Sequence, residues 1–292
     1  MKLAFLGIGQ MGLGMAKRLA QAGLDVCIYN RTIDKCEPLK AIGAKVATTP
    51  AEAVAHAGIV LTMLADDAAL SAVMNPDVVD SMPADAIHVS MSTISIALAG
   101  KMAKSHAEQG RTYLACPVFG RPDAAAAGQL RLCMSGDPII KEKVKPFLSP
   151  MGEIWDFGES LAGANVIKLA GNFMIGSTIE LLSEAFSLVE NNGIAPGEFA
   201  RFISATLFAA PVVQLYSQLI LDANFDDAGF TARLAAKDLG LVRDAARASK
   251  TPMPFAAIVE DRFLSAVAKG WGEKDMTVIA HAQREDAGLA HS

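Results

Sequence analysis

The sequence predicts an α/β protein, in which an N-terminal parallel sheet is joined by a long helix to an all-helical C-terminal domain. Short β-branched runs alternate with Ala-rich helical stretches in the first half of the chain, which is typical of a parallel sheet with crossover helices. No proline interrupts the apolar stretch 162–191, and only helical patterns follow it. A chain of 292 residues fits about two domains. We place them at 1–161 and 162–292, with 162–191 as the helix that joins them.

The first half is predicted element by element from its periodicity and from glycine and proline punctuation. The expected strands are 2–6, 26–30, 45–46, 59–63, 87–90, 130–134 and 154–155. The expected helices are 11–22, 33–41, 51–55, 68–73 and 96–109. Strand, helix and strand repeated at this spacing require parallel pairing.

The second half contains the longest apolar stretch of the chain. As a helix, the thirty residues 162–191 would be about 45 Å long. Because this stretch is apolar on all sides, we expect it to be buried. Further helices are expected at 196–207, 211–221, 230–249 and 254–269, with a frayed polar end at about 284–292.

Composition excludes several functional classes. The formal net charge is −5 and no run of five Lys or Arg occurs, so neither nucleic acid nor an anionic membrane is an expected partner. The short apolar run near the N-terminus does not suit a signal peptide, and no uninterrupted run of about 18 apolar residues predicts a membrane-spanning helix. The cysteines (27, 36, 116, 133) lack CxxC spacing and the histidines (56, 88, 106, 281, 291) are scattered. We therefore expect reduced thiols, a cytoplasmic location and no metal site.

A glycine-rich turn follows the first expected strand and opens the first expected helix. It consists of Gly7, Ile8, Gly9, Gln10, Met11 and Gly12, a GxGxxG pattern in the context that a dinucleotide site requires. In such a turn the first glycine makes the bend, the second lets the backbone approach a pyrophosphate, and the third allows close packing of helix on strand. The pattern predicts a dinucleotide-binding domain of the Rossmann type. The alternative is a glycine-rich turn in a domain without a ligand.

The second strand ends in Asn30, Arg31 and Thr32 instead of the acidic residue that usually binds the ribose of NAD. A carboxylate would repel a 2′-phosphate, whereas Arg31 can pair with it and Thr32 can donate a hydrogen bond. We therefore expect NADP in preference to NAD. The alternative is that Arg31 stacks on the adenine and accepts either cofactor.

Five segments in order resemble the β-hydroxyacid dehydrogenase family, which includes 3-hydroxyisobutyrate dehydrogenase and tartronate semialdehyde reductase. The segment 5–23 is similar to the family's nucleotide motif. The segment 90–95 (SMSTIS) is similar to the family's strand end beside the nicotinamide, and the segment 116–130 is similar to its substrate-binding stretch. GANVIKLAGN (163–172) resembles the catalytic helix and AAKDLGL (235–241) the segment that closes on the cofactor. The resemblance covers nearly the whole chain.

The resemblance implies that Lys168 is catalytic, with Asn172 orienting the substrate or Lys168. Independently, an ammonium on the most apolar helix is costly unless it has a partner, and burial can draw a lysine pKa toward neutrality, which suits a proton donor. Asn172 lies four residues after Lys168 and so on the same helix face. The alternative is a lysine that reaches solvent along the helix.

The resemblance also implies further cofactor contacts, a 6-phosphogluconate dehydrogenase-like C-terminal domain, and a homodimer or homotetramer formed through the helical domains. The implied contacts to the cofactor, in addition to the turn and the second strand end, are Met63, Leu64, Thr93, Phe230 and Lys237. Thr93 is implied at the substrate as well. The ordinary alternative is that Lys237, which precedes an aspartate, lies on a solvated helix face and does not contact the cofactor.

The substrate-binding stretch departs from the family pattern Asp-Ala-Pro-Val-Ser-Gly-Gly. Phe119 stands at the serine that helps to hold a substrate carboxylate, Gly120 is kept, and Arg121 replaces the last glycine. Phe119 makes the pocket more apolar, whereas Arg121 can supply a new carboxylate clamp. A surface pair of Arg121 with Asp123 is the alternative.

Three functions compete. The first is an NAD(P)-dependent dehydrogenase or reductase that transfers a hydride between nicotinamide and a short hydroxy acid or semialdehyde. An imine reductase shares the architecture but usually lacks the lysine, so Lys168 argues against it and Phe119 leaves it open. A non-catalytic nucleotide-binding oligomeric module would have no reason to keep Lys168, Asn172 and Thr93.

Overall fold

The computed structural model describes residues 1–289 and divides the chain into two compact units. The first unit comprises Met1–Lys168 and the second begins at Leu169. The division lies inside the long helix, a few residues after the boundary expected at 161/162. Each unit is described below by itself.

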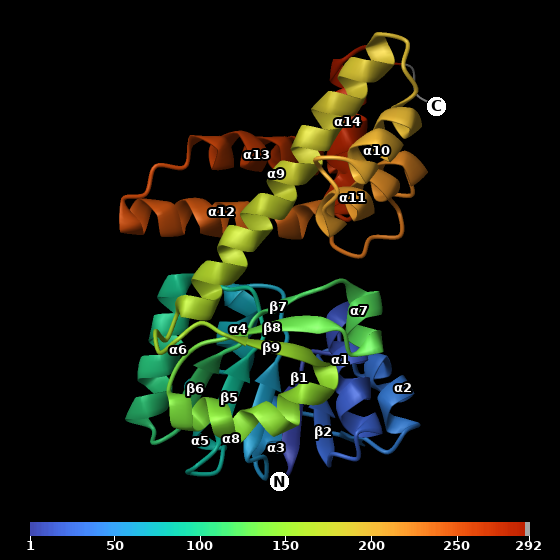
Figure 1. Cartoon of the computed structure of the whole chain (residues 1–292). Helices are drawn as coiled ribbons and strands as arrows, with labels where there is room; N and C mark the ends of the chain where they lie inside the picture. Colours follow the sequence, from blue (N-terminus) through green and yellow to red (C-terminus); the bar gives the residue numbers. More distant parts are fainter. Residues whose placement is uncertain (290–292) are drawn as a thin grey trace. The chain divides into compact units, whose positions relative to one another are not determined.

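The first unit contains a six-stranded parallel sheet in the order β3-β2-β1-β4-β5-β6 (Figure 1). Its strands are β1 (Leu3–Leu6), β2 (Val26–Tyr29), β3 (Lys45–Val46), β4 (Ile59–Thr62), β5 (Ile87–Ser90) and β6 (Thr112–Ala115). The strand order reverses at β1, which pairs with β2 on one side and β4 on the other. In such sheets ligands bind beyond the carboxyl ends of the strands at this switch point. The predicted fold class is confirmed.

Crossover helices connect the strands of the sheet. They are α1 (Gln10–Gln21), the 3₁₀ turn η1 (Ile33–Cys36) with α2 (Glu37–Lys40), α3 (Pro50–Val54), α4 (Asp67–Val73), α5 (Pro76–Asp80) and α6 (Ile96–Glu108). Side chains fix several of their starts. The Asp66 carboxylate accepts a hydrogen bond from the Ala69 N–H at 2.7 Å, and the Ser95 hydroxyl accepts one from the Leu98 N–H at 3.0 Å. These bonds satisfy backbone donors that have no partner within the first turn of a helix.

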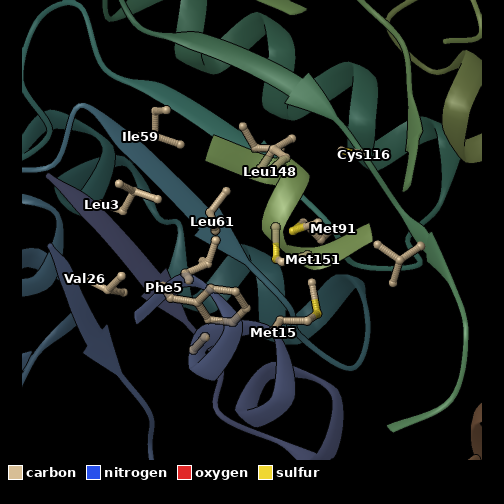
Figure 2. Packing of buried hydrophobic residues seen from close by; sticks show 14 of the residues in the cluster. Leu3, Phe5, Met15, Val26, Ile59, Leu61, Met91, Cys116, Leu148 and Met151 are labelled. Atoms are coloured by element: carbon tan, nitrogen blue, oxygen red, sulfur yellow. The ribbon is translucent and has the colours of Figure 1, made fainter. Parts of the chain in front are cut away.

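Both faces of the sheet are buried, as expected for parallel strands. Successive strand residues point to opposite faces, so Leu3 and Phe5 lie in one core and Ala4 and Leu6 in the other. Figure 2 shows the first core, where the Phe5 ring packs near Leu61 and Met15. This packing fixes the strand ends from which the candidate site is built.

A smaller three-stranded sheet, β7-β8-β9, completes the first unit. It comprises β7 (Val118–Phe119), β8 (Leu130–Met134) and β9 (Gly152–Asp156), with α7 (Pro122–Ala127), α8 (Pro138–Leu148) and the 3₁₀ turn η2 (Ser149–Met151) between them. Strands β6 and β7 and helices α5, α7 and α8 are absent from the sequence-based prediction. Strand β7 has only two residues, and a proline begins each of these three helices, which makes the segments resemble turns.

The second unit is helical. Helix α9 (Gly163–Asn191) continues into it from the first unit. It is followed by α10 (Pro196–Ala205), α11 (Pro211–Asp222), α12 (Ala232–Ser249), α13 (Pro254–Ala266), the π-helical turn η3 (Val267–Trp271), the 3₁₀ turn η4 (Met276–Val278) and α14 (Ile279–Asp286). Figure 1 shows α12 and α13 running side by side.

Two expectations about the ends of helices in the second unit require correction. Helix α10 ends before the expected 207, because Thr206 has non-helical backbone angles. The helix expected at 254–269 is formed by α13 together with the start of η3, and Gly270, with φ of +83°, follows its expected end. Arg284 is not frayed: it lies in α14 and forms an ion pair with Glu190, whereas 290–292 lie outside the described residues.

Helix α9 is not buried on all sides, contrary to the expectation from its composition. Met174, Leu181 and Leu188 are exposed, and its buried face carries Glu180, whose carboxylate pairs with Arg262 at 2.7 Å. By length and composition alone, α9 is long and apolar enough to cross a membrane. Core helices of other proteins pass the same test, and we interpret α9 as one of these.

Candidate active site

The glycine-rich turn links β1 to α1, and its three glycines have different surroundings. Gly7 has φ of +104°, and a Cβ there would lie 2.3 Å from the Met63 carbonyl oxygen. A Cβ on Gly12 would lie 1.9 Å from the Gly7 carbonyl oxygen, whereas a Cβ on Gly9 would meet nothing within 4 Å. The protein itself therefore requires Gly7 and Gly12, and Gly9 leaves open space in front of the turn.

Asn30, at the end of β2, holds this turn in place. Its Oδ1 accepts the N–H of Ile8 at 3.0 Å, and its Nδ2 donates to the Thr32 carbonyl oxygen at 2.8 Å. Helix α1 begins at Gln10 without a side-chain cap, so its first N–H groups face the space left by Gly9. An uncapped helix start beside an open glycine fits a dinucleotide pyrophosphate. Arg31 is exposed beside it.

The loops after β4 and β5 are tied together. The Leu64 N–H donates to Ser92 Oγ at 2.8 Å, which links the Met63–Leu64 loop to the segment containing Thr93. On the other side of Thr93, the Asp67 carboxylate accepts the Ser95 N–H at 2.9 Å and the Ser95 hydroxyl. Thr93 is half-buried between these two attachments.

Lys168 and Phe119 are brought together within the first unit. The Lys168 Nζ lies 4.1 Å from the centroid of the Phe119 ring, and both side chains are half-buried. Gly120 has φ of +135°, and Arg121 follows it as the N-terminal cap residue of α7. The predicted catalytic lysine and the predicted substrate-binding stretch therefore lie at the same place.

The thiol of Cys133 on β8 belongs to the same surroundings. Burial raises its pKa, and the positive charge of Lys168 opposes that effect. Cys133 is 3% exposed.

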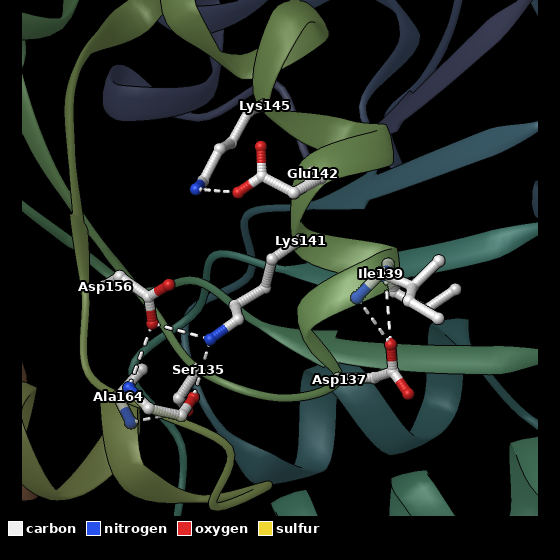
Figure 3. A network of polar contacts seen from close by, with 10 residues as sticks. Ser135, Asp137, Ile139, Lys141, Glu142, Lys145, Asp156 and Ala164 are labelled. Atoms are coloured by element: carbon white, nitrogen blue, oxygen red, sulfur yellow. Dashed lines mark hydrogen bonds and ion pairs between the residues drawn. The ribbon is translucent and has the colours of Figure 1, made fainter.

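Polar contacts of Ser135, Lys141 and Asp156 are drawn in Figure 3, and one of them fixes the start of α9. Ser135 Oγ accepts the N–H of Ala164 at 2.8 Å, in the first turn of the helix that carries Lys168. Lys141 Nζ donates to Asp156 at 2.6 Å and to the Gly158 carbonyl oxygen at 3.0 Å. The Lys141 side chain is almost fully buried, and the attraction to its ammonium lowers the pKa of Asp156.

The remaining predicted residues lie in the second unit. Asn172 is buried and donates its Nδ2 to the Asp238 carboxylate on α12. The Lys237 ammonium pairs with the same carboxylate at 2.7 Å. Phe230 is half-buried and packs against the helical core just before α12.

Sequence reasoning missed the residues that hold the others. Asp238 was visible only as the residue after Lys237, although it is 1% exposed and joins both predicted side chains. Asp67 and Ser135 lie in no motif that marks them, and Ser92 was not singled out although it lies in the segment 90–95. Serine and aspartate beside helix starts do signal caps, and this signal could have found Ser95 and Asp66.

The described part of the chain, residues 1–289, contains no group of three or more His, Cys, Asp or Glu that could hold a metal ion. All four cysteines are free thiols.

The fold and the glycine-rich turn define a dinucleotide-binding protein, and comparison with known proteins identifies its family. Residues 2–171 match the model of the NAD binding domain of 6-phosphogluconate dehydrogenase, and residues 162–282 match that of the NAD-binding domain of NADP-dependent 3-hydroxyisobutyrate dehydrogenase. The chain therefore belongs to the β-hydroxyacid dehydrogenase family.

Individual relatives cover nearly the whole chain. An uncharacterized oxidoreductase of Bacillus subtilis is 39% identical over 96% of this chain and 98% of its own length. Glyoxylate/succinic semialdehyde reductase 2 of Arabidopsis thaliana is 28% identical over 96% of this chain and 78% of its own length. The structure of Mycobacterium tuberculosis 3-hydroxyisobutyrate dehydrogenase with L-serine superposes with a TM-score of 0.86 at 26% identity, covering 97% of this chain and 99% of that one.

Proposed function

We propose that this protein is an NADP-preferring dehydrogenase or reductase that acts on a short hydroxy acid or semialdehyde, with Lys168 as proton donor and acceptor. The observation that carries the proposal is the Lys168 ammonium, held 4.1 Å from Phe119 in the substrate-binding stretch. A half-buried cation placed at such a stretch suits acid–base chemistry on a carbonyl or hydroxyl oxygen.

Each residue has a role in this proposal. Lys168 hydrogen-bonds the substrate oxygen and gives it a proton during reduction, or takes the proton during oxidation. A nicotinamide dinucleotide supplies or accepts the hydride when bound. The turn at Gly9 and the start of α1 bind its pyrophosphate, and Thr93, fixed by Ser92 and Asp67, lies at the substrate.

In the second unit, Asn172 and Lys237 share the Asp238 carboxylate. Asp238 restrains both side chains, so that each has a defined orientation before ligands bind. We assign Asn172 to the substrate, and Lys237 and Phe230 to the cofactor.

The substrate class follows from Arg121 and Phe119. Arg121 supplies the carboxylate clamp that the family's serine would otherwise help to form, and Phe119 contacts an apolar part of the substrate. Arg121→Ala is expected to raise KM for acidic substrates about tenfold or more, because a charge-assisted contact is lost. An unchanged KM would exclude the clamp.

An imine reductase remains the second candidate, because Phe119 replaces a polar residue at the substrate. NADPH consumption with a panel of substrates separates the two functions. The panel contains two- to four-carbon semialdehydes with a carboxylate, uncharged aldehydes and cyclic imines. Turnover confined to acidic semialdehydes supports the proposal, whereas turnover of imines alone contradicts it.

The role of Lys168 is tested separately with Lys168→Ala. We expect a loss of about 10²–10⁴-fold in kcat, with NADPH binding retained because the glycine-rich turn is untouched. Unchanged turnover would remove Lys168 from the mechanism. It would also favour a non-catalytic module if the wild-type protein itself turns over no substrate of the panel.

We further propose a cytoplasmic location and a homodimeric or homotetrameric assembly. The four free thiols suit a reducing compartment. The exposed apolar residues of α9 suit contact with a second copy.

A further inference from the structure

We propose that a cavity within the helical second unit binds a small aromatic carboxylic acid that carries a polar group on its ring. The cavity is lined by the C-terminal half of α9, the end of α11 and the start of α14, together with the loops beside them. Its volume is about 330 Å³, within the range of roughly 300–1,000 Å³ that is usual for ligand pockets. Its lining does not include Asn172, Phe230 or Lys237. The inference therefore goes beyond the proposed oxidoreductase function.

Aromatic rings form one wall of this cavity. The centroid of the His281 ring lies 6.1 Å from that of Phe225 and 5.2 Å from that of Trp271. Backbone hydrogen bonds hold the wall in place. The Asp275 N–H donates to the Phe225 carbonyl oxygen at 2.7 Å, and the Lys274 N–H donates to the Trp271 carbonyl oxygen at 3.0 Å. Rings in fixed positions favour a planar aromatic ligand, because little conformational freedom is lost when it binds.

A buried hydroxyl without a partner marks another wall. Ser183 and Ser187 of α9 both line the cavity. Ser183 Oγ donates to the Ile179 carbonyl oxygen at 2.7 Å, whereas Ser187 Oγ is buried and has no hydrogen-bond partner among residues 1–289. A buried polar group without a partner costs free energy. A ligand that places a polar atom beside Ser187 recovers this cost.

The charged side chains of the cavity favour an anion. Lys274, Arg284 and Glu190 belong to the lining, and Arg284 forms an ion pair with Glu190. The Lys274 ammonium pairs with Asp226, which is not part of the lining and whose side chain is 84% exposed. Because an ion pair with so exposed a partner contributes little, the carboxylate of a ligand can replace Asp226 at Lys274. A cationic ligand would be repelled by Lys274 and Arg284.

The difference in exposure between Lys274 and Ser187 orients the ligand. The Lys274 side chain is 34% exposed, whereas Ser187 is 2% exposed, which places the ammonium nearer the mouth and the hydroxyl nearer the inner end. The carboxylate of the ligand therefore lies at Lys274, its ring against Trp271, and the polar ring substituent at Ser187. The probe 3-(4-hydroxyphenyl)propanoate combines these three groups, and 3-phenylpropanoate lacks only the ring hydroxyl.

The two acids are titrated into the Trp155→Phe variant, and the fluorescence of Trp271 reports their binding. The chain contains two tryptophans, of which Trp155 lies on β9 and Trp271 lines the cavity. Trp271 is thus the single reporter in this variant. We expect the hydroxylated acid to bind about 2- to 10-fold more tightly than 3-phenylpropanoate, since one hydrogen bond is gained.

Further substitutions in the Trp155→Phe background assign the contacts. Ser187→Ala should abolish the preference for the hydroxylated acid, and Lys274→Gln should weaken both acids about 2- to 10-fold while retaining the preference. Ser217→Ala is the matched control and should change neither affinity. Ser217 Oγ is also buried without a partner among residues 1–289, but Ser217 does not line the cavity.

Several outcomes would overturn the inference. They are the absence of a Trp271 response to either acid, equal affinities for the two acids, and a preference that persists in Ser187→Ala. The last outcome is also the one expected if the acids bind at the candidate active site instead. The comparison of the two acids does not depend on the folding of the serine variants. Because no turnover is measured, the result is independent of the proposed function.

Discussion

At the residue scale, the glycine-rich turn shows how one residue type can serve the fold and the ligand in different ways. Gly12 is required because a Cβ there would lie 1.9 Å from the Gly7 carbonyl oxygen, and Gly7 is required by its positive φ. Gly9 has neither constraint: its backbone angles are extended and the space around it is open. Only a bound ligand gives a reason to exclude a side chain at Gly9.

Substitution by alanine separates these two roles. Gly12→Ala should destabilise the protein by roughly 1–3 kcal/mol, because the new Cβ displaces backbone. Gly9→Ala should cost under about 1 kcal/mol, yet weaken NADPH binding at least tenfold. Thermal unfolding and fluorescence titration give the two quantities. If Gly9→Ala bound NADPH like the wild type, the pyrophosphate would have to lie elsewhere.

Arg31 is the residue to which we attribute the expected preference for NADP over NAD. The amide of the neighbouring Asn30 is used within the protein, its Oδ1 by the Ile8 N–H and its Nδ2 by the Thr32 carbonyl oxygen, which leaves the Arg31 and Thr32 side chains to meet the ribose substituent. We expect the wild type to bind NADPH more tightly than NADH, and Arg31→Ala to lose roughly tenfold or more for NADPH with little change for NADH. Equal wild-type affinities in a binding titration would contradict the assignment.

At the element scale, a buried polar chain connects β4, β5 and α6. Thr62 Oγ1 lies 2.9 Å from His88 Nε2, His88 Nδ1 lies 3.0 Å from His106 Nε2, and His106 Nδ1 lies 2.7 Å from the Met102 carbonyl oxygen. Because that carbonyl oxygen only accepts, two neutral rings permit a single pattern, in which each Nδ1–H donates. Burial, together with the neighbouring His106, places the pKa of His88 well below its ordinary value, and burial lowers the pKa of His106.

These shifts predict a loss of stability in mild acid. The unfolded chain takes up protons on both rings below about pH 6.5, whereas the folded chain resists protonation, so the free energy of unfolding falls as pH decreases. Urea unfolding at pH 7.5 and 5.5 should show this decrease in the wild type. A double variant, His88→Gln with His106→Gln, should show a smaller decrease. His56→Gln, at an exposed position, is the control that should retain it; an equal decrease in the double variant would refute the explanation.

The elements also show what the sequence could predict. Periodicity located the large-sheet strands β1, β2, β4 and β5, since each is a short apolar run between turn signals. It missed β6 and β7, which only Cys116 and Pro117 separate. The turn at Gly7–Gly12 is local in sequence and was predictable, whereas the contact of Phe119 with Lys168 joins segments that only the fold brings together. Asp238 and Ser135 were missed for the same reason, because their partners are distant in sequence.

At the scale of the whole molecule, the helical half leaves apolar surface exposed that a monomer would not be expected to keep. Met174, Leu181 and Leu188 are spaced seven residues apart on α9 and are 67%, 56% and 66% exposed. Seven residues are nearly two helical turns, so the three side chains form one stripe. Such a stripe on a helix is the pattern by which helices pack against one another. We infer that a second copy of the chain covers it.

Light scattering after gel filtration tests this assembly. The wild type should have two or four times the chain mass of 30.6 kDa. Leu181→Lys combined with Leu188→Lys should shift it toward the mass of one chain, because two charges would be buried in an apolar contact. Ile139→Lys is the matched control, since Ile139 is 78% exposed on α8, and its mass should not change. A wild type with the mass of one chain would contradict the assembly, and a double variant of wild-type mass would show that the contact lies on another surface.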